Sequence, residues 1–139
     1  IEFVRALAGV SYYNDSKATN TDSAIKALEA FDGHIILIAG GDDKLTDLGE
    51  FMELVHARVD ELILVGDAAE RFAAAARDAG IPEAQIHRVG YHMEKAVQLA
   101  RELAVEGQIV LLSPACASFD MYGGYEERGR DFKRLVNEL

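Results

Sequence analysis

The sequence predicts an α/β fold: a Rossmann-like, mostly parallel sheet with flanking helices. The first observation is a set of short, continuous apolar runs such as His34–Ala39 and Glu61–Val65, which are typical of strands buried on both faces of a parallel sheet. The second is that segments with apolar residues at helical spacing lie between these runs. Strands that alternate with helices in this way are connected by right-handed crossovers and pair in parallel.

The N-terminal part of the chain is predicted to form a hairpin and a helix. Phe3–Leu7 and Val10–Tyr13 have the composition of short strands, and Ala8-Gly9 between them favours a tight turn. A polar loop, Asn14–Asn20, separates the hairpin from a helix that Gly33 is predicted to end. The apolar residues that indicate this helix by their spacing are Ala24, Ile25, Leu28 and Phe31.

The central part contains the most apolar strand, His34–Ala39, followed by a loop rich in glycine and charge, Gly40–Asp47. A helix then precedes the strand Glu61–Val65, and an alanine-rich helix, Ala68–Ala79, follows it and is closed by Gly80. The helix between the two strands is predicted from an apolar face that consists of Leu48, Phe51, Met52, Val55 and Val59.

The C-terminal part repeats the same alternation. Ile86–Val89 is predicted as a short strand, His92–Ala104 as an amphipathic helix and Gln108–Leu112 as a further buried strand. A loop, Ser113–Gly124, leads into a final helix. The apolar face of that helix is predicted to contain Phe132, Leu135, Val136 and Leu139.

Length and composition limit what the protein does. A chain of 139 residues fits a single domain, 1–139. The formal net charge of −10 argues against nucleic acid and against an anionic membrane surface as partners. No apolar run approaches the roughly 20 residues of a membrane helix, and no signal peptide is recognised. Cys116 is the only cysteine, which suits a reducing compartment, and we expect a cytoplasmic protein.

The unusual loops Asn14–Asn20, Gly40–Asp47 and Ser113–Gly124 all follow predicted strands. If those strands are parallel, the loops meet at one edge of the sheet. Ligands of open α/β sheets bind at this edge, outside the carboxyl ends of the strands. We therefore expect the functional site where the three loops converge.

The first loop combines groups that suit an anion. It runs into a helix start, whose free N–H groups and partial positive charge favour anions, and Lys17 adds a full charge. Thr19 offers a hydroxyl donor, and Asp15 is placed to accept hydrogen bonds from sugar hydroxyls. The alternative is that Thr19, Asn20 or Thr21 simply caps the helix, and the residues alone give that interpretation about equal weight.

The other two loops are less specific when taken alone. Gly40 and Gly41 allow a tight turn next to a ligand, and Lys44 suits a carboxylate or phosphate, although the residues of this loop alone favour an ordinary turn with solvated charges. The phosphate-loop and dinucleotide glycine patterns are both missing. Ser118 is a plausible donor to an anion and a poor nucleophile, because no histidine lies near it in the sequence.

Three remaining features are expected to be structural. Cys116 is predicted as a small buried hydrophobe, and the run Glu126–Asp131 as the solvated start of the last helix. The four histidines lack the spacing of metal ligands.

Taken together, the loops resemble the C-terminal domain of the Mur ligase family, in particular of its D-glutamate-adding members. The matching segments read NDSKATN at 14–20, GGDDK at 40–44 and LSPACASFDMYGGYEERGRDF at 112–132, and the resemblance extends over essentially the whole chain. It implies a ligase that joins D-glutamate to UDP-N-acetylmuramoyl-L-alanine through an acyl phosphate, with ATP and Mg²⁺, in building the peptidoglycan of the cell wall. The partners that it implies are these substrates and a central ATPase domain.

The resemblance also implies roles for individual residues. Thr19, Lys44 and Ser118 are similar to residues that bind the carboxylates of D-glutamate, and Tyr125 stands where the family often has a phenylalanine that contributes its backbone N–H. Asp15 is similar to the residue that holds the ATP ribose, and Lys17 to a lysine near both ligands. No phosphate loop or magnesium ligands of a central domain are recognised, so we expect this chain to fold without catalysing alone.

Two other classes of protein are compatible with the residues alone. One is a free-standing Rossmann-like nucleotide-binding module. The other is a receiver-like regulatory domain, which Asp42 and Asp43 after a strand would suit, although Lys44 lies in the same loop instead of at another strand end.

Overall fold

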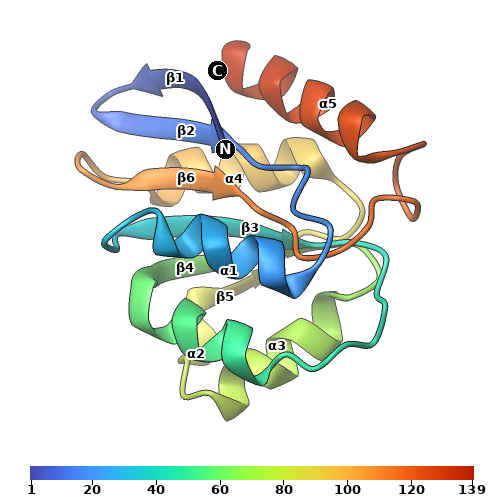
Figure 1. Ribbon diagram of the computed structural model, residues 1–139. Helices are drawn as coiled ribbons and strands as arrows, with labels where there is room; N and C mark the ends of the chain where they lie inside the picture. The colour runs from blue at the N-terminus through green and yellow to red at the C-terminus, as the bar shows by residue number, and fades with distance from the viewer.

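A six-stranded sheet with the order β1-β2-β6-β3-β4-β5 forms the centre of the computed structural model, which describes residues 1–139 (Figure 1). All neighbouring strands pair in parallel except β1 and β2, which form an antiparallel hairpin. The mostly parallel sheet and the N-terminal hairpin predicted from the sequence are thus confirmed. The strands are β1 (Glu2–Leu7), β2 (Val10–Asn14), β3 (Ile35–Gly40), β4 (Val59–Val65), β5 (Ile86–Arg88) and β6 (Ile109–Leu112).

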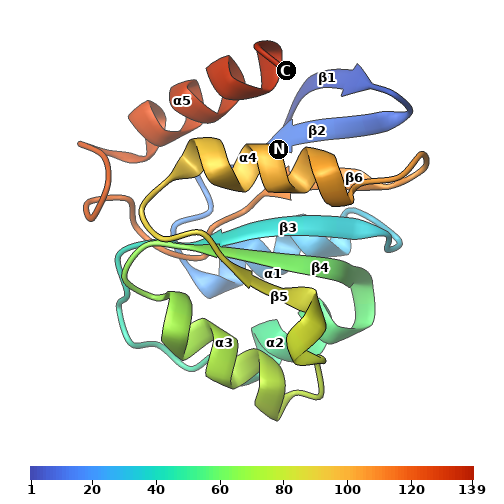
Figure 2. The ribbon, with the colours of Figure 1, turned by 180° about the vertical axis from the view of Figure 1, so that it is seen from behind.

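Helices cover both faces of this sheet, as the two opposite views show (Figures 1 and 2). One face packs against the first three α-helices and the other against the last two. A short 3-10 helix, Glu83–Gln85, leads into β5. The α-helices are α1 (Thr21–Glu29), α2 (Gly49–Arg58), α3 (Ala69–Asp78), α4 (Met93–Leu103) and α5 (Tyr125–Asn137). None of these helices is long and apolar enough to cross a membrane.

Strand β3 explains why the sheet needs helices on both sides. All its side chains are buried, and successive side chains point to opposite faces. Ile35, Leu37 and Ala39 belong to the core beneath α1, α2 and α3. Ile36 and Ile38 belong to the core beneath α4 and α5. The continuous apolar run therefore serves two hydrophobic cores at once, as predicted from the sequence.

Several helices are shorter than their apolar residues predicted, and two residues that lie outside them show why. Phe31 lies beyond the end of α1 and instead packs edge-on against Tyr13, with ring centroids 5.0 Å apart. Val59 has extended backbone angles, pairs with Ile35 and begins β4, so this strand is longer than Glu61–Val65. In both cases a partner distant in sequence decides the conformation, and helical spacing does not reveal such a partner.

Candidate functional site

The loops that follow β2, β3 and β6 meet at one edge of the sheet, on the right in Figure 1. Backbone hydrogen bonds join them: the N–H of Asp15 donates to Leu112 O at 2.7 Å, and that of Ala115 to Ala18 O at 2.9 Å. The N–H of Asp42 donates to Ala117 O at 2.9 Å. The Ser113–Gly124 loop thus lies between the other two and contacts both, and the convergence expected from the sequence is confirmed.

The N-cap of α1 decides a question that the sequence left open, which is whether Thr19 caps this helix or is available to a ligand. Asn20 is the N-cap, and its Oδ1 accepts a hydrogen bond of 2.9 Å from the backbone N–H of Ser23. The half-buried Thr19 therefore does not cap the helix. Lys17 is exposed on the same loop and takes part in no ion pair of the structure. Both side chains are available to a ligand.

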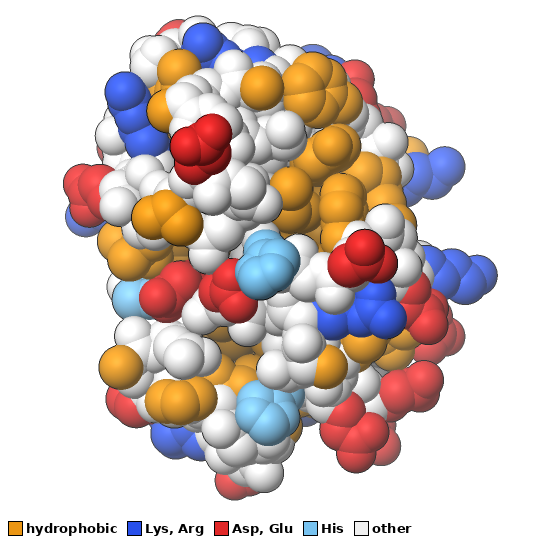
Figure 3. All heavy atoms as spheres, turned by 90° about the vertical axis from the view of Figure 1, so that its left-hand side faces the viewer, with side chains coloured by type: hydrophobic (Ala, Val, Ile, Leu, Met, Phe, Trp, Pro, Cys, Tyr) orange, Lys and Arg blue, Asp and Glu red, His pale blue; other side chains and the backbone are white.

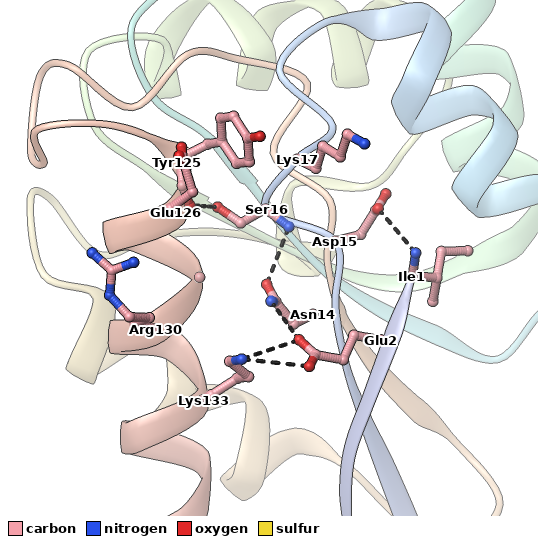
Figure 4. A pocket seen from close by; sticks show the side chains of 11 residues that line it. Ile1, Glu2, Asn14, Asp15, Ser16, Lys17, Tyr125, Glu126, Arg130 and Lys133 are labelled. Carbon is pink, nitrogen blue, oxygen red and sulfur yellow. Dashed lines mark hydrogen bonds and ion pairs between the residues drawn. The ribbon is translucent and has the colours of Figure 1, made fainter.

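A hollow beside this loop contains Asp15 and Lys17 on one side and α5 on the other (Figure 4). Asp15 Oδ2 accepts a hydrogen bond of 2.9 Å from Ser113 Oγ. The carboxylate is thus held at the mouth of the hollow. The helix side contributes Tyr125, Glu126, Gly129, Arg130 and Lys133.

The loop after β3 is anchored to helix α3. Arg71 donates to both oxygens of Asp43, at 2.7 Å and 2.9 Å, and this pairing lowers the pKa of the Asp43 carboxyl below its usual value. Lys44, the next residue, is exposed and takes part in no ion pair. The interpretation of this loop as a turn with solvated charges is therefore wrong for Asp43 and fits Lys44.

Ser118 is the most unusual polar group of the edge. Its side chain is only 2% exposed, and its Oγ has no hydrogen-bond partner in the structure. A buried hydroxyl without a partner is costly and calls for a ligand or another specific explanation. Gly41 lies against the same loop, and a Cβ there would be 2.5 Å from Ala117 O. The two loops pack this closely because Gly41 has no side chain.

Arg128 is the residue of this site that the sequence interpretation missed. The run Glu126–Asp131 was expected to be solvated, which is wrong for Arg128, because its side chain is only 2% exposed. It donates to Ser16 Oγ at 2.8 Å, to Ser16 O at 2.7 Å and to Cys116 O at 3.0 Å. The spacing of Arg128, Phe132 and Val136 on one face of α5 is the signal that would have revealed it.

Tyr125 and Cys116 support the same junction from two sides. Tyr125 is the first residue of α5, its carbonyl accepts a hydrogen bond of 2.8 Å from Ser16 Oγ, and its backbone N–H has no partner within the helix. Cys116 is buried, as predicted, and burial raises the pKa of its thiol to about 12. A thiol of this kind is not a nucleophile at neutral pH.

The surface at the opposite end of the sheet carries other kinds of side chains (Figure 3). Histidine rings lie there among acidic and hydrophobic side chains. His34 Nδ1 is 3.6 Å from Asp60, and His87 Nε2 is 2.7 Å from Glu61. No group of three or more histidine, cysteine or acidic residues in the structure is arranged to hold a metal ion.

Comparison with known proteins identifies the family of this chain. Residues 1–116 match the family model described as "Mur ligase, glutamate ligase domain". The matched range includes the loops after β2 and β3 and the start of the loop after β6. This chain belongs to the Mur ligase family. The UDP-N-acetylmuramoylalanine–D-glutamate ligase of Thermoanaerobacter pseudethanolicus is 50% identical to it over 139 residues, and the alignment covers 100% of this chain.

The Mur ligase relatives are longer proteins. The chain spans about 30% of the length of the curated relatives that it matches. Among solved structures, a murein peptide ligase from Psychrobacter arcticus aligns with 99% of this chain and 30% of its own, with a TM-score of 0.60 at 12% identity. The MurF ligase of Thermotoga maritima, in complex with ADP, aligns with 97% of this chain and 30% of its own, with a TM-score of 0.52 at 18% identity. Both likenesses concern the Mur ligase fold.

Proposed function

We propose that this Mur ligase domain binds D-glutamate in an ATP-dependent ligase that adds D-glutamate to UDP-N-acetylmuramoyl-L-alanine during peptidoglycan precursor synthesis. The whole-chain similarity to relatives of that name supports the proposal. The structural observation that carries it is Ser118, whose buried Oγ lacks a partner at an edge that also presents Lys17 and Lys44 without ion pairs. An acidic ligand would supply what all three side chains lack.

The chemistry of D-glutamate fits this inventory. Its two carboxylates need cations and hydrogen-bond donors at fixed separation, and charge-assisted bonds of this kind are the strong ones. We assign Lys44 and Thr19 to one carboxylate. Ser118 and the backbone N–H of Tyr125 are assigned to the other, with Lys17 close to both the amino acid and the nucleotide. The amine of D-glutamate would then be free to attack.

The nucleotide would lie beside Asp15 in the hollow shown in Figure 4. Asp15 already accepts from Ser113 through Oδ2 and retains further lone pairs for a ribose hydroxyl. The chain offers no group of residues for Mg²⁺, so we assign the metal to a central domain of the longer protein. That domain would also supply the phosphate-binding loop, and the complete enzyme would work in the cytoplasm.

The reaction assigned to the longer protein is amide formation. The alanine carboxylate of the UDP-linked substrate takes the γ-phosphoryl group of ATP, and ADP leaves. The D-glutamate amine then attacks the activated carbonyl, and phosphate leaves. In this scheme the present domain holds the D-glutamate amine in position for attack. Holding the amine in place lowers the entropic part of the activation barrier. The isolated domain would bind without turning over.

The decisive experiment uses the full-length parent enzyme. ADP release is followed with UDP-N-acetylmuramoyl-L-alanine, ATP and Mg²⁺, and D-glutamate is compared with L-glutamate and other D-amino acids. We expect turnover with D-glutamate alone. A folded enzyme that turns over with none of these amino acids would refute the proposal.

The assignment of Lys44 has its own test. Lys44→Ala in the full-length enzyme should raise the KM for D-glutamate strongly, by about 30-fold or more for a lost charge-assisted bond, while the KM for ATP changes little. Lys95→Ala, which removes an exposed lysine from α4, is the matched control. An unchanged dependence on D-glutamate would remove Lys44 from the binding site.

A further inference from the structure

Arg128 is a buried cation without an anionic partner. Its guanidinium donates only to neutral acceptors, Ser16 Oγ, Ser16 O and Cys116 O, and it belongs to none of the ion pairs of the structure. Burial lowers its pKa to about 10, so it still carries its charge at neutral pH. The desolvation of an unpaired charge costs several kcal/mol, and most buried arginines offset this with a carboxylate.

The acidic groups around Arg128 form no ion pair with it. Asp120 is near enough to influence its pKa, but the Asp120 carboxylate accepts from the backbone N–H of Asp67 at 3.0 Å and forms no ion pair. The thiol of Cys116 and the phenol of Tyr122 are neutral at pH 7, because burial raises the pKa of both. The positive charge is therefore open to an anion from outside the chain.

The position of this charge links it to all three loops of the candidate site. Ser16 lies between Asp15 and Lys17, and Cys116 lies two residues before Ser118. On the remaining loop, the one after β3, a Cβ placed on Gly41 would lie 3.4 Å from Nη1 of Arg128. The guanidinium thus bonds two of the three loops and lies close to the third, and the unpartnered Ser118 Oγ belongs to one of these loops.

We propose that Arg128 is the positioning residue of the acidic-substrate site. It fixes the backbone of the first and third loops through Ser16 and Cys116, and its charge attracts a substrate carboxylate from beneath without touching it. This inference rests on the proposed binding of D-glutamate. It explains why α5 keeps an arginine on the face that otherwise packs Phe132 and Val136 into the core.

The test separates charge from hydrogen bonding in the full-length enzyme. Arg128→Met removes both, whereas Arg128→Lys keeps the charge and loses the planar fork of donors. Arg128→Met should raise the KM for D-glutamate on the order of 30-fold, as expected for a charge that acts over several ångströms through the protein interior. The turnover number at saturating D-glutamate should change by less than about threefold. The KM for ATP should rise less than the KM for D-glutamate, because Arg128 reaches the nucleotide side only through the backbone of Ser16.

Two comparisons complete the design. Arg128→Lys should recover most of the lost affinity for D-glutamate. Arg101→Met, the same change at an exposed arginine of α4, should leave all kinetic constants as in the wild type. If Arg128→Met does not fold, Arg128→Gln, which keeps an amide donor and loses the charge, must show the same rise in KM.

Other outcomes overturn the inference in recognisable ways. If neither neutral variant changes the KM for D-glutamate, or if the lysine and neutral variants impair all substrates equally, Arg128 is purely structural. Such a result with an active wild-type enzyme leaves the proposed function intact. A wild-type enzyme that does not use D-glutamate removes the proposed function, and this inference with it.

Discussion

Arg71 holds Asp43 through two parallel hydrogen bonds, from Nε to Oδ2 at 2.7 Å and from Nη2 to Oδ1 at 2.9 Å. The pair joins helix α3 to the loop after β3. Because Asp43 directly precedes Lys44, the clamp restricts the positions that this exposed lysine adopts. Bidentate pairs of this kind add geometric specificity as well as binding energy.

The clamp predicts an effect on substrate affinity without contact to the substrate. Arg71→Ala and Asp43→Ala in the full-length enzyme should each raise the KM for D-glutamate about three- to tenfold, because loosening a substrate-positioning group weakens binding geometry. The double variant should be no worse than either single one, since both belong to one interaction. Arg77→Ala, at another arginine of α3, is the control, and additive losses would show that Arg71 and Asp43 act separately.

Asp120 predicts a pH dependence of stability. Burial raises the pKa of its carboxyl, so the folded state binds this proton more tightly than the unfolded state does. Stability is then lost as the pH rises from the unfolded pKa through the folded one. Asp120→Asn can still accept from the Asp67 N–H but cannot ionise.

Thermal unfolding of the two proteins at several pH values tests this sign. The variant should match the wild type most closely below the normal carboxyl pKa and should gain relative stability as the pH rises to 7. A relative stability of the variant that falls with rising pH would contradict the assignment.

Gly41 and Gly107 form a matched pair for measuring how closely the loops pack. Both have positive φ, +136° and +96°, so alanine is strained at either position. A Cβ at Gly41 would be 2.5 Å from Ala117 O, whereas at Gly107 it meets nothing within 4 Å. Gly107→Ala should cost about 1 kcal/mol of unfolding free energy and Gly41→Ala about 3 kcal/mol or more. Equal losses in urea unfolding would mean that the loops adjust without cost.

Thr19 and Asn20 are adjacent and should respond in opposite ways. Asn20→Ala removes the cap of α1 and should cost about 1 kcal/mol of stability with little change in the KM for D-glutamate. Thr19→Ala should cost less than about 0.5 kcal/mol, while raising that KM about tenfold. Unfolding experiments and steady-state kinetics on both variants test these two roles. A rise in the KM for D-glutamate with Asn20→Ala alone would assign substrate binding to Asn20 instead of Thr19.

The sequence predicted the fold well because its strongest signals are local. A run such as Ile35–Gly40 is apolar throughout, so a strand buried on both faces follows from composition alone. Element ends were less predictable. Phe31 continues the spacing of α1 but is held by Tyr13, and Val59 continues that of α2 but pairs with Ile35. The spacing of apolar residues within one segment does not indicate which distant segment it contacts.

The candidate site was likewise only partly predictable from the sequence. That the three loops converge followed from parallel strands, whereas the ligand-binding roles of Thr19 and Lys44 stay predictions. The clamp by Arg71 and the burial of Arg128 did not follow, because charged residues on amphipathic helices usually face water. Where α5 begins decides which of its arginines points inward, and helix starts are the least certain part of any prediction from sequence.

Cys116, the single thiol of the chain, reports on the transient opening of the Ser113–Gly124 loop. With a pKa of about 12 and only 3% of its surface exposed, it is shielded from alkylating reagents while the Ser113–Gly124 loop stays closed. Labelling therefore counts openings of that loop, in the same manner as exchange of a protected amide proton. Slower labelling in the presence of an amino acid would reveal occupancy of the edge without any turnover, and in the domain by itself.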